Sequence, residues 1–425
     1  MPKPRITHLL ACALCTLATQ QNRALAQPAT QSCVWLPNPI ILYGTTAVEP
    51  VIANLGARLS QLNPPYSLLY VGFNGCDSLG YVSGEMSISG SAEFYSMKDD
   101  GTATIDTCSL NSLGKNLADV SLLDVYRETC PGSAASVLKV RDSSSNGPEP
   151  MVDFQGPIQA SVFVVPRSNF STTYLSLDQM RDILVCGSSG QIYPFVDKNQ
   201  IFTCGGASGA GDSGMTQMTF ASLGLSIQRL CGLTCNHDNL WISGVAASVA
   251  HSITPKSAIG FVSGEVYDQY RDSLKSLAMQ GPGQSKAYYP DSNSTSRDRR
   301  MVRDGHYVFQ GPLHMVARAS PDNVLEHDGA KRFINWMLQK PGIPGEAPLP
   351  FNIIDVFAES GVVPQCAMQV RRYKDGGPFT PYRDAQPCGC YFEAKATGVA
   401  EPCGCKPCSA QSECGSQLCS YGFCE

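Results

Sequence analysis

This 425-residue sequence has little charge, a deficit of basic residues and no long apolar run beyond its N-terminal segment. Charged residues make up 16% and hydrophobic residues 43% of the chain, a balance typical of a globular rather than a disordered protein. No later stretch is apolar for the length of a membrane-spanning helix, so we expect no transmembrane segment in the mature chain. The 31 Lys and Arg are outnumbered by 36 Asp and Glu, which argues against nucleic acid as a partner.

Histidine is also scarce, with six in the chain. The segment Gly211-Asp212-Ser213-Gly214 matches the nucleophile motif of trypsin-like proteases, whose catalytic order is His, Asp, Ser. His8 is the one histidine before Ser213, and it lies in a segment that we expect to be removed, so this order is excluded. Residues 206–210 nearly match the nucleophile elbow of α/β-hydrolases, and five histidines follow them. A secreted serine hydrolase using Ser208 or Ser213 is therefore an alternative, although we predict no catalytic residue.

The N-terminus has the pattern of an export signal. Basic residues at Lys3 and Arg5 precede a short apolar run, and Ala24-Leu25-Ala26 matches a small-residue cleavage site. We predict that residues 1–26 are a signal peptide cut after Ala26 and that the mature protein is periplasmic or secreted. Removal of the signal peptide leaves 28 basic against 36 acidic residues. Because the mature chain then has a net negative charge, a bound anion would have to be held by local hydrogen-bond donors rather than attracted by the electrostatic field of the whole protein.

Cysteine, by contrast, is abundant, with 19 in the chain and 17 after export. In an oxidising compartment this number predicts disulfides. Eight lie in the last 38 residues: Cys388, Cys390, Cys403, Cys405, Cys408, Cys414, Cys419 and Cys424. We interpret residues 385–425 as a separate disulfide-stapled module that shares little core with the body, and we expect all eight cysteines to be oxidised.

The remaining nine cysteines run from Cys33 to Cys366. Because nine is odd, one of them is free, pairs with the tail or pairs between chains. The spacings Cys388-x-Cys390 and Cys403-x-Cys405-x-x-Cys408 could suggest zinc, but the tail contains no histidine, and export favours disulfides. We therefore predict no metal and no cofactor.

Apolar segments with strand and helix spacing alternate along the body. Strands are predicted near residues 34–43, 68–73, 118–125, 158–166 and 259–263, and helices near 48–59, 175–184 and 267–278. This alternation predicts an α/β fold with a largely parallel sheet, and the length predicts at least two lobes. Polar loops follow several of the strands, at the edge where ligands bind in such sheets.

One of these loops is rich in Gly and Ser and connects a short strand near Ile201 with a helix that begins near Gly214. Glycine lets the backbone approach a ligand closely, and the first N–H groups of a helix have no internal partner. An anion is therefore favoured at this position. The simpler interpretation is a surface turn in which Asp212 or Ser213 caps the helix.

The order of four loops resembles that of the phosphate-type substrate-binding proteins of ABC importers. The matching segments are Gly44-Thr45-Thr46, residues 74–80, Leu123-Asp124-Val125 and Ser208-Gly209-Ala210. The resemblance implies a two-lobed, type II periplasmic-binding-protein-like α/β fold with an added disulfide-rich C-terminal tail. Lobe 1 would comprise residues 33–160 and 266–380, and lobe 2 residues 161–265.

The resemblance also implies a non-catalytic protein that closes on a small oxyanion such as phosphate and delivers it to an ABC permease. The implied ligand-binding residues are Thr45, Thr46, Gly75, Cys76, Asp77, Asp124, Ser208, Gly209 and Ala210. Backbone N–H groups and hydroxyls would donate to the ligand. The Asp124 carboxylate would accept a hydrogen bond from a protonated ligand and reject a fully deprotonated one such as sulfate.

Three departures from the family pattern weaken this expectation for phosphate. Leu123 and Ala210 replace a Ser and a Thr, and Thr203 and Cys204 stand near the usual position of an Arg. A neutral hydrogen bond contributes about 0.5–1.5 kcal/mol and a charged one about 1.5–3 kcal/mol. We expect phosphate binding to be weaker than in the family. A ligand-free surface-interaction or structural protein on the same fold is the alternative.

Overall fold

The computed structural model describes the following residues: 31–98, 101–111, 116–130, 140–147, 149–168, 172–186, 202–204, 214–225, 233–234, 242–253, 255–256, 258–340 and 343–425. The expected signal peptide and five residues singled out in the sequence, Ser208, Gly209, Ala210, Asp212 and Ser213, lie outside them.

Lobe 1 is built on three parallel strands, β1 (Pro39–Thr45), β2 (Ser67–Phe73) and β5 (Val120–Leu123). The antiparallel pair β3 (Ser91–Met97) and β4 (Ala103–Ser109) extends this sheet beyond β2. Three helices contribute to one core cluster with β1 and β2: α1 (Glu49–Leu59), α9 (Asp328–Met337) and α10 (Ile353–Ser360). The short helix α2 (Ser78–Ser83) belongs to the other cluster, so both faces of the sheet are covered. Pro50 lies in the first turn of α1, as the sequence predicted.

Lobe 2 repeats this plan with a second set of strands. The parallel strands are β9 (Phe202–Cys204), β10 (Leu233–Thr234) and β11 (Ala258–Ser263), and their helices are α4 (Leu177–Cys186), α5 (Gly214–Leu223), α6 (Ile242–Ala250) and α7 (Gly264–Gln269). Two short strands, β8 (Tyr174–Leu175) and β13 (Ala278–Met279), form a separate pair, whereas β6 (Val140–Asp142) belongs to lobe 1 and pairs with the first residues of β7.

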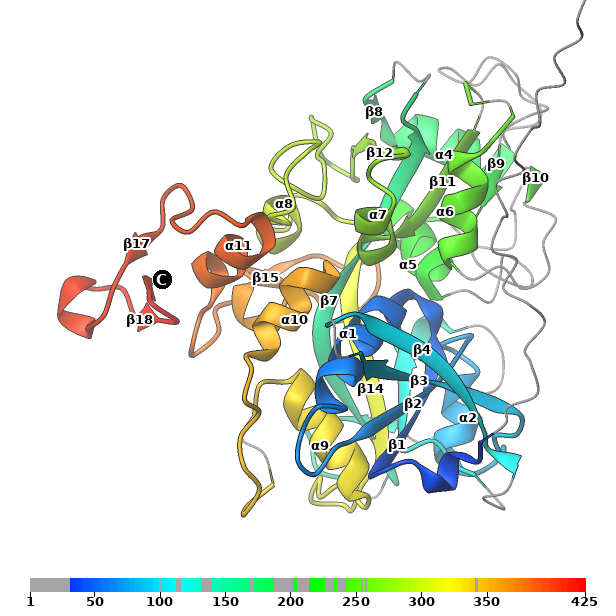
Figure 1. Ribbon diagram of the computed structural model, residues 1–425. Helices are drawn as coiled ribbons and strands as arrows, with labels where there is room; N and C mark the ends of the chain where they lie inside the picture. The colour runs from blue at the N-terminus through cyan, green and yellow to red at the C-terminus, as the bar shows by residue number, and fades with distance from the viewer. Residues whose placement is uncertain are drawn as a thin grey trace, which may run out of the picture.

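Two long strands connect the lobes. The 16-residue β7 (Met151–Pro166) pairs with β14 (Gln310–Arg318) up to Ala160 and with β11 from Ser161 onward. Figure 1 shows β7 passing from the lower to the upper lobe. The strand order is β4-β3-β2-β1-β5-β14-β7 in lobe 1 and β10-β9-β11-β7 in lobe 2, where β12 (Leu274–Ser276) also pairs with β7. The predicted two-lobed α/β fold is confirmed.

The structure corrects two sequence-based expectations. The sheet is mixed rather than largely parallel, because β14 runs antiparallel to β5 and to β7. The helix predicted for residues 267–278 ends at Gln269, and Leu274–Ser276 form β12. Strand β12 pairs with the end of β7 and buries Leu274 and Ser276, so tertiary pairing overrides the local helical spacing.

The C-terminal segment is attached to the body through helix α11 (Gly389–Thr397). A disulfide joins Cys366 of the body to Cys388, which resolves the odd cysteine count in favour of a body–tail pair. Phe392 is fully buried in the main core cluster, and Arg303 forms a buried ion pair with Glu393. The expectation that the module shares little core with the body is therefore wrong for this helix.

Beyond α11 the chain forms a projecting knob (Figure 1). It is built around a three-stranded sheet in the order β17 (Lys406–Pro407), β19 (Phe423–Cys424) and β18 (Cys419–Ser420). Three disulfides hold it: Cys390–Cys405, Cys408–Cys419 and Cys414–Cys424. Within the described chain Cys403 is free and exposed, so the expectation of eight oxidised cysteines is wrong at this position. The sulfurs of Cys408, Cys414 and Cys419 lie close together, but all three are in disulfides, which agrees with the preference for disulfides over zinc.

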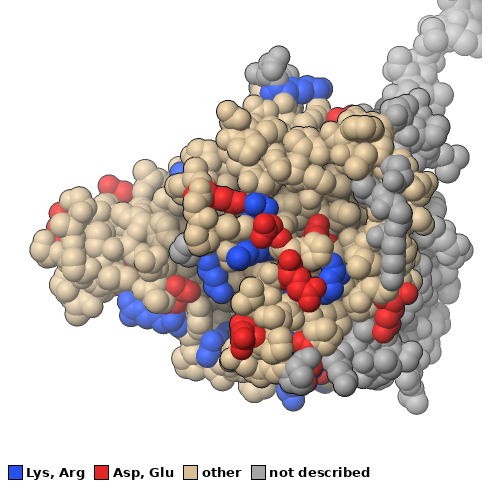
Figure 2. Space-filling view, turned by 90° about the horizontal axis from the view of Figure 1, so that it is seen from below, with Lys and Arg blue, Asp and Glu red and all other residues tan. Residues whose placement is uncertain are grey.

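Surface charge is mixed rather than segregated on the face seen in Figure 2. Lys and Arg side chains alternate there with Asp and Glu, and no patch of a single sign dominates this face. Among the residues described above, no helix is long and apolar enough to cross a membrane.

Candidate functional site

Asp124 lies at the centre of the candidate site, immediately after β5. All four residues of β5 are buried, so the strand carries the following carboxylate to the end of the sheet inside the protein. Asp124 is 3% exposed, and its Oδ2 accepts a hydrogen bond of 2.9 Å from the Thr45 hydroxyl. Its Oδ1 has no hydrogen-bond partner in the described part of the chain. A buried acceptor without a partner is costly, which marks this atom as one that a ligand or water could satisfy.

Two glycines from different lobes lie against this carboxylate. A Cβ placed on Gly75, in the loop after β2, would be 3.2 Å from Asp124 Oδ1. A Cβ on Gly214, the first residue of α5, would be 1.8 Å from the same atom. A side chain at residue 214 is therefore excluded, and the N-terminus of a lobe 2 helix directly abuts a lobe 1 carboxylate. Helix N-termini favour negative charge, so this contact joins the lobes in an electrostatically favourable way.

The environment of Asp124 changes its acidity. Burial raises the pKa of Asp124 to about 6, although the Thr45 hydrogen bond and the nearby Met215 N–H, which does not meet hydrogen-bond geometry, lower it. The nearby Asp375 carboxylate adds a further increase in the pKa of Asp124. Near neutral pH the group is mainly an acceptor, and below about pH 6 it becomes a donor.

The structure brings together Thr45, Gly75 and Asp124, but not all of the residues singled out in the sequence. Thr45 also accepts from the Ala47 N–H and thereby caps a short 3₁₀ helix, η2 (Thr46–Val48), in which Thr46 is half-buried. Thr45 thus combines this capping role with its hydrogen bond to Asp124.

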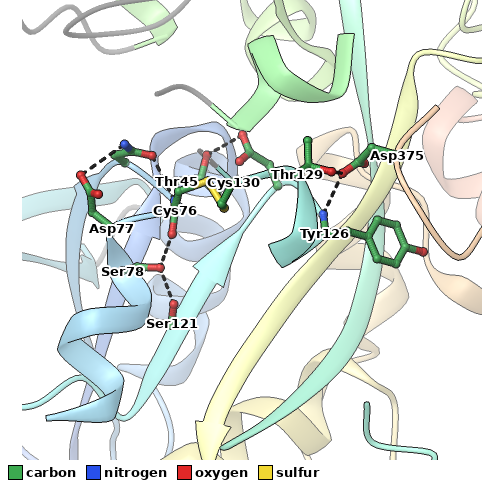
Figure 3. The surroundings of a disulfide bond; sticks show 12 residues. Thr45, Cys76, Asp77, Ser78, Ser121, Tyr126, Thr129, Cys130 and Asp375 are labelled. Atoms are coloured by element: carbon green, nitrogen blue, oxygen red, sulfur yellow. Dashed lines mark hydrogen bonds between the residues drawn. A yellow bond between two sulfur atoms is a disulfide. The ribbon is translucent and has the colours of Figure 1, made fainter. Parts of the chain in front are cut away.

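Two of the predicted ligand-binding residues, Cys76 and Asp77, make contacts other than with Asp124. Cys76 forms a disulfide with Cys130, and Asp77 is exposed and accepts a hydrogen bond from Asn74. Figure 3 shows Asp77 on the opposite side of this disulfide from Asp375. The disulfide nevertheless fixes the loop that carries Gly75 to the segment after β5, and it thereby stabilises the wall behind Asp124.

Sequence reasoning missed a second buried carboxylate, Asp375. Its Oδ2 accepts 2.9 Å from the Tyr126 backbone N–H and 2.7 Å from the Thr129 hydroxyl (Figure 3). Its Oδ1 has no hydrogen-bond partner among the residues that are described. Burial raises the pKa of Asp375, and the hydrogen bond from Thr129 opposes this effect. The two sides of this contact are 249 residues apart in the chain, and no local motif predicts their meeting.

Gln159 lies on the same side of the sheet as Asp375. It pairs with Gly311 across β7 and β14, so the two residues face the same way. A Cβ on Gly311 would meet Met218 of α5 at 3.1 Å and Asp375 Oδ1 at 3.7 Å. Both polar atoms of the buried Gln159 amide lack a partner within the described ranges. The junction between the lobes thus contains several buried polar atoms that a small polar solute or water could satisfy.

The hydrolase alternative can be examined at one described histidine. His314 Nδ1 lies 2.7 Å from Asp153 Oδ2, which has the form of a His–Asp pair. Burial lowers the pKa of His314, but the Asp153 carboxylate together with Asp375 and Glu128 raises it, and the pKa lies above its ordinary value. The ring is 1% exposed and is covered by the Tyr126 ring at 4.3 Å, so a substrate cannot reach it in this arrangement.

A cavity of about 160 Å³ lies beside the 3₁₀ helix η4 (Arg127–Thr129) and has Arg127, Arg141, Asp142 and Asp153 in its lining. The guanidinium of Arg141 already donates to Asn323, Glu149 and Ser320, and Arg127 donates to Glu128. Because these cations are already paired, the cavity is a poorer anion site than the junction at Asp124.

No protein-family model matches the sequence, and no curated protein matches it either. Solved structures do resemble the fold. One is a putative phosphate ABC transporter substrate-binding protein with bound phosphate from Clostridium perfringens, with 12% identity and a TM-score of 0.48 over 77% of this chain and 99% of that chain. An ABC-type phosphate transport receptor from Vibrio cholerae has 14% identity and a TM-score of 0.45, over 76% and 99%.

The substrate-binding domain of a putative molybdenum ABC transporter from Clostridium difficile is also similar, with 12% identity and a TM-score of 0.35 over 77% of this chain and 98% of that chain. Because identity is this low, the chemistry of this chain must be argued from the site described above.

Proposed function

We propose that the chain is an exported, non-catalytic solute-binding protein that takes up a small protonated oxyanion between its lobes, with phosphate as the first candidate. The observation that carries this proposal is Asp124. Its carboxylate is buried where the strand ends of lobe 1 meet the N-terminus of a lobe 2 helix, and one of its oxygens has no partner in the part of the chain described.

The surroundings of Asp124 suit a ligand that both accepts and donates hydrogen bonds. The N–H groups at the start of α5 would donate to oxyanion oxygens. The ionised Asp124 would accept one proton-bearing oxygen of the ligand and would repel an anion that has no proton to donate. We expect Ser208, Gly209 and Ala210, just before α5, to add hydrogen-bond donors to the ligand. The bound solute would then be delivered to an ABC permease.

The direct test of this assignment is calorimetry with phosphate on the oxidised, full-length mature protein. Replacing Asp124 by Asn removes a charged acceptor, which is worth about 1.5–3 kcal/mol. Asp124→Asn should therefore weaken phosphate binding roughly 10- to 150-fold near neutral pH.

Asp119→Asn is a matched control, because Asp119 lies just before β5, at the opposite end from Asp124, where it accepts the Ile41 N–H at 2.8 Å. It should leave phosphate affinity unchanged. Equal phosphate affinity of wild type and Asp124→Asn would show that the site has been placed wrongly.

A second candidate is a ligand-free interaction or structural protein on the same fold. The contact between Gly214 and Asp124 favours it, because the two lobes meet there without space for a side chain. This candidate predicts that phosphate and a panel of other oxyanions produce no binding heat with folded protein.

A further inference from the structure

A hairpin near the C-terminus reaches from the tail attachment to the junction between the lobes. Its two strands are β15 (Val370–Arg371) and β16 (Thr380–Pro381), which pair antiparallel. At its base, the Gln369 N–H donates to the Arg303 carbonyl and the Tyr382 N–H donates to the Gln369 carbonyl. The Cys366–Cys388 disulfide joins the segment before the hairpin to the segment after it. The hairpin is thus covalently anchored, and its tip, residues 372–379, extends away from the anchor.

The tip is bound to lobe 1 through a carboxylate. Asp375 accepts from the Tyr126 N–H and from the Thr129 hydroxyl, two and five residues after Asp124. The Tyr126 hydroxyl also donates to the Arg372 carbonyl. A backbone N–H and a hydroxyl are the donors that an oxyanion would use in this fold. The chain therefore places a carboxylate of its own beside Asp124 and binds it as an anion would be bound.

The same tip is packed against lobe 2. Gly376 has a φ of +65°, and a Cβ on it would lie 2.2 Å from the carbonyl oxygen of Ala221 in α5. The backbone of the tip therefore contacts a lobe 2 helix at a distance that only glycine permits. Arg372 donates 2.6 Å to the carbonyl of Val308, just before β14, so the tip is also bound to the segment that returns from lobe 2 to lobe 1.

We propose that the hairpin from Val370 to Pro381 is an intramolecular lock, which bridges the two lobes beside Asp124 and must withdraw before they can separate. The tip contacts lobe 1 through Asp375, lobe 2 through Gly376 and the connecting segment through Arg372. Solute entry and release are then limited by withdrawal of the tip, and an anionic solute competes with the Asp375 carboxylate. The lock requires no bound solute, so its test is independent of the calorimetry described above.

The test is amide hydrogen exchange followed by mass spectrometry on the oxidised, full-length protein without added solute. In Asp375→Asn, the charged acceptor is lost while the shape is kept. Asp375 takes its two hydrogen bonds from lobe 1, so faster exchange in α5, residues 214–223, would report separation of the lobes rather than loss of a local bond. We expect exchange in α5 to be about tenfold faster or more, since a charged hydrogen bond is lost.

Gly376→Ala provides a second variant, because its Cβ would collide with Ala221 and push the tip away from α5. Gly345→Ala is the matched control: Gly345 has a similar φ of +89°, but among described residues nothing lies within 4 Å of its added Cβ. Gly376→Ala should accelerate exchange in both residues 120–130 and 214–223, and Gly345→Ala in neither. If Asp375→Asn exchanges in α5 at the wild-type rate, the lock is excluded, whatever Gly376→Ala does.

Discussion

Removing residues 388–425 should lower the free energy of unfolding by on the order of 5 kcal/mol or more, because this truncation removes part of the body's core. Loss of a fully buried Phe side chain such as Phe392 costs about 3–5 kcal/mol, and loss of a native disulfide typically about 2–4 kcal/mol. Arg303 would also lose its buried ion pair with Glu393 and its hydrogen bond to the Gly389 carbonyl. Urea denaturation of the truncated and full-length proteins under oxidising conditions measures this difference.

The control is a chain that ends at Gly398 and carries Cys390→Ser. It keeps α11 and the Cys366–Cys388 bond but lacks the knob, whose three disulfides include the one from Cys390. Its stability should stay much closer to that of the full-length protein. Equal stability of the chain that lacks residues 388–425 and the full-length chain would restore the interpretation of the tail as an independent module.

Glu265→Gln should make the protein more stable than wild type at alkaline pH. From pH 5 to pH 8 the free energy of unfolding of wild type should fall by about 4 kcal/mol relative to that of the variant. Glu265 is 1% exposed, and neither of its carboxyl oxygens has a hydrogen-bond partner within the described residues. Burial raises the pKa of Glu265 to about 8, although Ser263 and Arg299 lower it. The folded state therefore keeps a proton that the unfolded chain releases above pH 4.5.

The direction of the pH effect follows from this raised pKa. The stabilising contribution of protonated Glu265 is fully present below pH 4.5 and is lost progressively as the pH rises to about 8. Glutamine has a similar shape and no charge, so Glu265→Gln should lack this loss. Urea denaturation at several pH values gives the measurement, and Glu401→Gln at an exposed position is the control. An identical pH dependence in wild type and Glu265→Gln would contradict a buried, protonated Glu265.

The features that the sequence predicts correctly depend on short-range patterns. The apolar run before Asp124 places that carboxylate at a buried strand end, and the end of β1 places Thr45 beside it. The alternation of strands and helices likewise predicts the α/β class, and the length of the chain predicts more than one lobe. These features arise because hydrophobic periodicity and strand-end loops are encoded within a few residues of each other.

The features that the sequence does not predict depend on contacts between distant segments. The contact of Gly214 with Asp124, the hydrogen bond between Asp375 and Tyr126 and the Cys366–Cys388 disulfide all form only when the chain is folded. Residues 274–276 follow the same rule, because their pairing with β7 outweighs a local helical pattern. Cys403 shows the converse, since an even cysteine count in the tail does not ensure that each sulfur has a partner.

Calorimetric titration of phosphate and sulfate at about pH 5 and pH 7.5 tests the proposed role of Asp124 most directly. Because the pKa of Asp124 is about 6, its carboxylate is an acceptor at pH 7.5 and mainly a donor at pH 5. The proposed role predicts that phosphate binds and sulfate does not at pH 7.5, and that sulfate binding emerges at pH 5 in wild type. Equal binding of phosphate and sulfate at pH 7.5, or no binding heat from either solute, would contradict the assignment of Asp124 as the carboxylate that selects a protonated oxyanion.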